Sequence, residues 1–157
     1  MAEERTRAIV MGPGDGRTVA NPAGGGLTYK ARSWQTGGAL TAWESTAAPG
    51  KGPPLHLHVN EDEFMYVLEG RVRFRLDETN HMAPAGSSVF IPRGLPHAWQ
   101  NAGDGYARIL FVFTPGSPGM ERFFERSAEL PEDTRMADVF KKLAGDAGMK
   151  VLGPPLV

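Results

Sequence analysis

Two histidines, His56 and His58, occur one residue apart in the stretch HLHVNEDEFMYVLEG, and Glu63 follows them. The whole chain has only 4 histidines, so this pairing concentrates a side chain that commonly binds metals. Residues i and i+2 of a β-strand point to the same face, so both imidazoles would face one way. A hairpin turn at residues 60–62 would return the Glu63 carboxylate toward them. The pattern predicts half of a metal site.

A second stretch, GSSVFIPRGLPHAWQN, supplies a fourth candidate ligand. Pro92 and Gly94 predict a tight turn, and His97 begins the strand expected after it. Three neutral imidazoles and one carboxylate suit a borderline divalent transition metal. A metal that prefers five or six ligands would keep open positions, as catalysis requires. The predicted ligands of one metal ion per chain are His56, His58, Glu63 and His97.

Strand alternation also predicts where the neighbours of these ligands point. Met65 shares a face with Glu63 and is expected near the metal. Trp99 shares a face with His97 and is a candidate for the substrate pocket, with the barrel core as the alternative. Glu61 and Asp62 fall in the turn between the strands, so we expect both carboxylates to be solvated.

Short β-strands are expected to carry these residues, because apolar and polar side chains alternate along much of the chain. The predicted strands cover residues 27–34, 39–46, 55–59, 63–68, 71–76, 87–91, 97–100 and 107–113, with another near 8–11. Residues 77–84 are expected to form a surface loop that contains His81. Many short strands at close spacing predict an all-β sandwich or barrel.

Helical patterns replace strand patterns after Thr114. Ser117 and Pro118 have the types expected of a helix N-cap and first helical residue. Phe123 and Phe124 on this helix would either pack on the barrel or form a lid. A second helix is expected from about Asp133. The predicted apolar face of this second helix contains Met136, Val139, Phe140 and Leu143.

The whole chain, residues 1–157, is expected to form a single domain. It would comprise an N-terminal arm (1–26), a barrel core (27–114) and two C-terminal amphipathic helices (117–148). The helices would pack on the barrel or on a partner subunit.

Composition excludes several classes of protein. The chain has 157 residues, a net charge of −1 and no cysteine, so disulfides and thiolate chemistry are excluded. The sequence has no stripe of basic residues, so it does not indicate a nucleic-acid partner. No apolar run is long enough to span a bilayer, and the charged start MAEERTR does not resemble a signal peptide. We therefore expect a cytoplasmic protein with a small-molecule partner.

Over about residues 24–130 the chain resembles the cupin superfamily. The resemblance is carried by two motifs, Gly50-x5-His56-x-His58-x4-Glu63-x6-Gly70 and Gly86-x5-Pro92-x-Gly94-x2-His97-x3-Asn101. It implies a small double-stranded β-helix, the jelly-roll barrel of cupins, with a metal on the same four ligands and often a homodimer. Within that superfamily the chain resembles quercetinase-like single-domain cupins, which cleave flavonols with O2.

Three functions fit these expectations. The first is a dioxygenase of flavonol-like or other enolisable aromatic compounds, with Ni, Mn, Fe, Co or Cu and possible use of O2. In this reading Glu63 is the catalytic base. The second is a non-oxidative cyclase or isomerase of a polyketide or keto compound, with Zn or another Lewis acid and with Glu63 as the base. The third is a small-molecule-binding cupin without catalysis.

Overall fold

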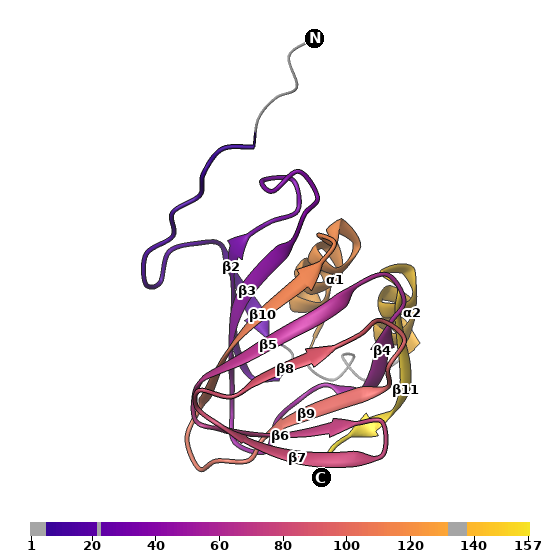
Figure 1. Cartoon of the computed structure of the whole chain (residues 1–157). Helices are drawn as coiled ribbons and strands as arrows, with labels where there is room; N and C mark the ends of the chain where they lie inside the picture. Colours follow the sequence, from indigo (N-terminus) through magenta and orange to yellow (C-terminus); the bar gives the residue numbers. More distant parts are fainter. Residues whose placement is uncertain (1–5, 22, 132–137) are drawn as a thin grey trace.

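The computed structural model describes residues 6–21, 23–131 and 138–157 and contains two antiparallel sheets that face each other (Figure 1). The six-stranded sheet has the order β1-β2-β3-β10-β5-β8, and the five-stranded sheet has the order β11-β4-β9-β6-β7. The larger sheet contains β1 (Thr18–Asn21), β2 (Gly25–Ala31), β3 (Thr41–Ala47), β10 (Ala107–Thr114), β5 (Asp62–Glu69) and β8 (Ser88–Ile91). The smaller contains β11 (Met149–Pro155), β4 (Pro54–His58), β9 (His97–Asn101), β6 (Arg71–Leu76) and β7 (Thr79–Pro84). Two helices follow β10, so the predicted all-β class with C-terminal helices is confirmed.

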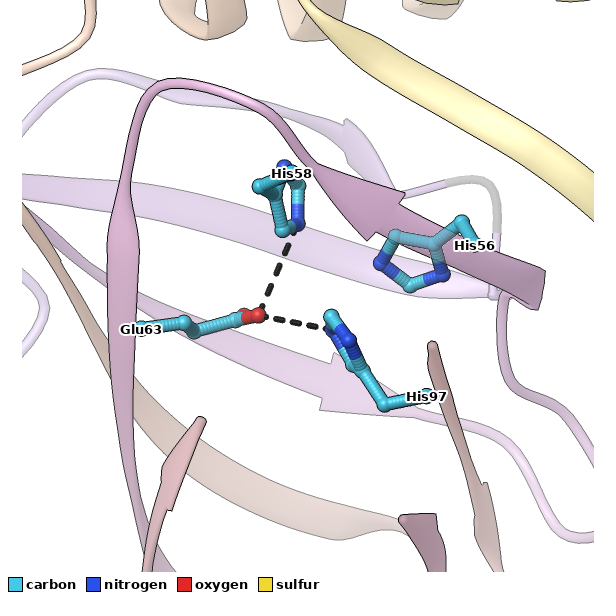
Figure 2. Close-up of side chains that lie close together, drawn as sticks. All are labelled: His56, His58, Glu63 and His97. Atoms are coloured by element: carbon cyan, nitrogen blue, oxygen red, sulfur yellow. Dashed lines mark hydrogen bonds and ion pairs between the residues drawn. The ribbon is translucent and has the colours of Figure 1, made fainter. Parts of the chain in front are cut away.

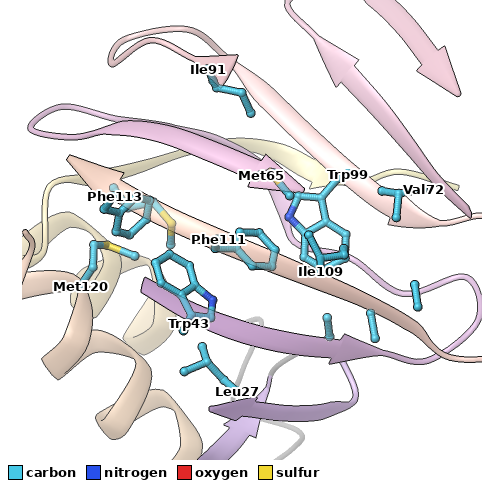
Figure 3. Packing of buried hydrophobic residues seen from close by; sticks show 14 of the residues in the cluster. Leu27, Trp43, Met65, Val72, Ile91, Trp99, Ile109, Phe111, Phe113 and Met120 are labelled. Carbon is cyan, nitrogen blue, oxygen red and sulfur yellow. The ribbon is translucent and has the colours of Figure 1, made fainter. Parts of the chain in front are cut away.

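Alternating side chains from the two sheets fill the space between them. Strand β10 shows the pattern clearly, because Ile109, Phe111 and Phe113 are buried while the residues between them are half-buried. Trp43 on β3 lies opposite Phe111 in the register and stacks on its ring at 5.0 Å between centroids. Figure 3 shows these rings clustered between the sheets. Burial of such aromatic side chains is the main force that holds sandwiches of this kind together.

Helix α1 (Pro118–Glu129) begins as predicted. The Ser117 side chain caps it by accepting a hydrogen bond from the Met120 N–H, and Pro118 occupies the first turn. Met120 and Phe123 are buried against the barrel. Within the described residues, neither helix has the length and apolarity needed to cross a membrane.

Helix α2 (Asp138–Asp146) packs on α1 through Phe140, whose ring lies 5.3 Å from that of Phe123 between centroids. Its predicted start at Asp133, and Met136, lie outside the described residues. The prediction for Val139 was wrong, since that side chain is 48% exposed. The buried face instead contains Ala144, because Ala144 lies one helical turn after Phe140 on the same face.

Several segments differ from the sequence prediction. Residues 8–11 form no strand, whereas residues 79–84, expected as a loop, form β7. Among the strands that the structure describes, β7 pairs only with β6 at the edge of its sheet, and most side chains of β7 are exposed, so it lacks the alternation that reveals a strand. His81 on β7 is exposed, as expected for a surface residue. Strand β11, at the other edge, was not predicted because its prolines argue against a strand.

Candidate metal centre

The four predicted ligands meet between the two sheets. One ligand atom from each of His56, His58, Glu63 and His97 lies within 4.8 Å of the others, and Figure 2 shows the side chains converging. The histidines come from β4 and β9 of the smaller sheet, and Glu63 comes from β5 of the larger sheet. The site therefore bridges the sheets, and none of the four residues is more than 4% exposed.

Hydrogen bonds orient two of the imidazoles. The Nδ1 atom of His56 lies 2.7 Å from the Pro54 carbonyl, and Nδ1 of His97 lies 2.9 Å from the Leu95 carbonyl. A carbonyl oxygen only accepts, so each Nδ1 carries the proton. The Nε2 atoms are then left for a metal, in the arrangement that metal-binding histidines usually adopt.

The Glu63 carboxylate lies among the histidines. Its Oε2 atom is 3.0 Å from Nε2 of His97 and 3.5 Å from Nε2 of His58. One oxygen thus contacts the two nitrogens that would face a metal. Three Nε2 atoms and a carboxylate oxygen form a donor set that fits a divalent transition metal, so these four residues can hold one.

Burial sets the charge of the histidines. It lowers the pKa of His56 to about 3, with a further contribution from the nearby charge of His97. Burial also lowers the pKa of His58 well below its ordinary value. At His97 burial acts in the same direction, but the hydrogen bond that the ring donates to the Glu63 carboxylate and the negative charge of that carboxylate outweigh burial and raise the pKa of His97. His56 and His58 are therefore neutral near pH 7, which is the form that binds metal.

The prediction that Glu61 is solvated was wrong. Glu61 is only 3% exposed, because it turns inward and accepts a hydrogen bond from the Ser117 hydroxyl at the start of α1. Burial raises the pKa of its carboxyl group. Asp62, the next residue, is part-exposed and forms an ion pair with Arg93 at 3.0 Å. The turn sequence alone carries no signal that separates these two carboxylates.

A cavity of about 600 Å³ adjoins the cluster, a volume within the range of small-molecule sites. His56, His58 and Glu63 contribute to its wall. Most of the remaining wall is apolar and aromatic. The aromatic side chains in it are Trp43, Trp99, Phe111, Phe113, Phe123, Phe124 and Phe140.

Of the two residues predicted for the substrate pocket, only one lies in the described wall of the cavity. Trp99 lines the cavity, next to the strand residue His97 that shares its face. Met65 is fully buried between Phe111 and Val89 in the register, and it is not among the described residues of the cavity wall. Sequence patterns did not indicate Trp43. Phe123 and Phe124 both pack on neighbouring rings and line the cavity, so α1 forms part of the pocket wall.

Residues 43–113 match the family model described as a cupin domain. The chain is 33% identical over 105 residues to the polyketide synthase CurC of Streptomyces cyaneus, and the match covers 67% of this chain and 62% of CurC. The chain thus spans less than two thirds of that relative's length.

Solved structures show the same fold. The polyketide cyclase RemF of Streptomyces resistomycificus superposes with a TM-score of 0.60 at 21% identity, over 71% of this chain and 82% of RemF. An RmlC-like cupin from Shewanella frigidimarina gives 0.62 at 17% identity, over 75% of this chain and 99% of that one. The motifs, the two-sheet barrel and these matches lead to one conclusion: this chain belongs to the cupin superfamily.

Proposed function

We propose that this protein is a metal-dependent cyclase of polyketide-like poly-carbonyl compounds. The observation that carries the proposal is the aromatic cavity that ends on the cluster of metal ligands. The names of CurC and RemF support it, since one is a polyketide synthase protein and the other a polyketide cyclase. A chain of alternating ketones becomes flat and aromatic as it cyclises, and a cavity lined by aromatic rings would suit such a product.

The ligand residues would hold the metal on one side of the cavity. His56, His58 and His97 supply nitrogens and Glu63 supplies an oxygen. When bound, a divalent metal would supply Lewis-acid polarisation of a substrate carbonyl or enol oxygen.

Glu63 is the proposed base. Its carboxylate lies at the cavity wall and is nearly buried, so a proton acceptor is presented to substrate in a water-poor space. It would accept a proton from a carbon between two ketones. That carbon then bonds to a second carbonyl carbon of the same chain, which closes the ring, and the carbonyl oxygen gains a proton. Loss of this hydroxyl as water, with a hydrogen from the neighbouring carbon, forms a double bond in the ring.

The aromatic walls would orient the substrate. Trp43 and Phe111 stack in parallel, and Phe124 on α1 lies 5.2 Å from Trp43 between ring centroids. Flat apolar surfaces on the barrel and on the helix favour a folded, planar chain over an extended one.

The flavonol dioxygenase uses the same ligands and cavity, and it remains the second candidate. Its support is the donor set, which also suits a redox-active metal. The two reactions differ in their need for oxygen. The test is to measure the metal content per chain and then incubate the loaded protein with a synthetic poly-β-ketone under argon. Ring formation with loss of water supports the cyclase. Absence of cyclised product, together with O2 uptake on quercetin, overturns it.

A further inference from the structure

The turn residue Glu61 lies between a metal ligand and the start of helix α1. We propose that Glu61 is a positioning residue that holds His58 in its metal-binding orientation and ties that orientation to α1. The proposal rests on the metal site described above and extends it to a residue outside the ligand set.

His58 differs from the other two histidines in the partner of its Nδ1 atom. His56 and His97 each direct Nδ1 at a backbone carbonyl. The Nδ1 of His58 is buried and has no hydrogen-bond partner among the residues that the structure describes. A buried polar atom without a partner is costly, so its surroundings are expected to contain one within a small movement.

The Glu61 carboxylate is that partner. Its Oε2 atom lies 3.9 Å from Nδ1 of His58, and it is likewise buried without a hydrogen-bond partner in the described structure. The distance exceeds that of a hydrogen bond by about 1 Å. When Nε2 of His58 binds a metal, the ring proton is on Nδ1. Nδ1 then donates a hydrogen bond, so its partner has to be an acceptor. A carboxylate in this position orients the ring and raises its basicity as a ligand.

The other Glu61 oxygen connects the site to the cavity wall. It accepts the Ser117 hydroxyl, and the same Ser117 oxygen caps α1 by accepting the Met120 N–H at 3.2 Å. The Ser117 N–H in turn donates to Thr41 on β3 at 2.9 Å. Helix α1 then carries Phe124 into the cavity. One side chain therefore fixes both a ligand ring and the first turn of the helix that would contact substrate.

The test compares metal binding by the wild-type protein and two matched variants. Glu61→Gln keeps the size of the side chain and removes its charge. Asp62→Asn makes the same change at the neighbouring carboxylate, which pairs with Arg93 and is not one of the four clustered ligands. Affinity for Zn²⁺ is measured by competition with a chelator. The orientation of His58 is followed by the NMR signals of its ring nitrogens and by the absorption spectrum of the Co²⁺ protein.

The expected result is a loss of about 10- to 100-fold in Zn²⁺ affinity for Glu61→Gln, with a changed His58 signal and an altered Co²⁺ spectrum. Asp62→Asn should match the wild-type protein in Zn²⁺ affinity, in the His58 signals and in the Co²⁺ spectrum. Wild-type affinity and spectra in Glu61→Gln would overturn the inference and leave the metal site intact. Equal losses in both variants would also overturn it, because they would indicate a general effect on the turn. Absence of metal binding by the wild-type protein would instead refute the metal site itself.

Discussion

His56 and His97 lie directly opposite each other on the adjacent strands β4 and β9, with ring centroids 4.3 Å apart. Each ring also bonds through Nδ1 to the carbonyl two residues before it in the chain. Strand pairing therefore sets the positions of both rings, and the backbone sets their rotation. The protein itself therefore holds half of the ligand set in place, which lowers the cost of ordering a metal site.

Replacement of His97 by Ala should remove metal content and activity together. It deletes one of three nitrogen ligands and leaves Glu63 without its 3.0 Å partner. Elemental analysis of the purified variant checks this prediction. His81→Ala is the control, since His81 is exposed on β7 and should leave the metal content unchanged. Full metal occupancy in His97→Ala would refute the four-ligand site.

Replacement of Glu63 by Gln should reduce turnover more than metal binding. Three histidines would still hold the metal, whereas an amide cannot accept a proton as a carboxylate does. We expect kcat to fall by about 10²- to 10⁴-fold, the usual contribution of a general base. Steady-state kinetics at measured metal occupancy provides the check. Turnover at the wild-type rate would show that another group is the base.

Removal of the Phe124 ring should weaken substrate binding and spare the metal. The ring contacts Trp43 at the cavity wall, and such aromatic contacts contribute about 0.5–1.5 kcal/mol. Phe124→Ala should therefore raise KM by about twofold to tenfold, with unchanged metal content. Phe90→Ala is the matched control, because Phe90 is 61% exposed and is not among the described cavity residues. Equal KM values for both variants would argue against α1 as a substrate wall.

Glu121 should be essential for docking α1 on the barrel. Its buried carboxylate accepts hydrogen bonds from the Ser33 N–H at 2.7 Å and the Thr41 hydroxyl at 2.8 Å, and it pairs with Arg32 at 3.0 Å. Glu121→Ala would leave these groups without a partner, so we expect a loss of about 3–5 kcal/mol in the free energy of unfolding. Urea denaturation measures it. Glu129→Ala, at an exposed position of the same helix, should change little.

Stability should fall in alkali because of Tyr29. Burial raises the pKa of its phenol well above the ordinary value, and the charge of Glu125 adds to the effect. The unfolded chain loses this proton near pH 10 while the folded chain keeps it. The contribution of Tyr29 to the free energy of unfolding is therefore complete below about pH 10 and declines by about 1.4 kcal/mol per pH unit above it.

Urea denaturation at about pH 8 and about pH 11 tests this prediction. Tyr29→Phe should be less stable than the wild-type protein at the lower pH, since it lacks the hydrogen bond to the Glu121 carbonyl. It should lose less stability between the two pH values. An identical loss in both proteins would assign the effect to other groups.

Local periodicity was enough to predict several features. Alternation along a strand depends only on neighbouring residues, so the shared face of His56 and His58 followed from their spacing. The helix start at Ser117 and Pro118 is equally local, because a cap involves only the next few residues. The strands rich in alternating apolar residues, such as β10, were found for the same reason.

Contacts between distant segments decided the rest. The edge strands β7 and β11 owe their conformation to the partners β6 and β4, not to their own residues. Met65 and Trp99 both point inward, but only the packing of the sheets determines which of them borders the cavity. Glu61 turns into the protein because Ser117, far along the chain, offers it a hydroxyl. The sequence by itself determined the ligand types and the faces they occupy, since these depend on local geometry. The tertiary structure alone decided the cavity wall and the surroundings of each ligand, since these depend on which strands and helices meet.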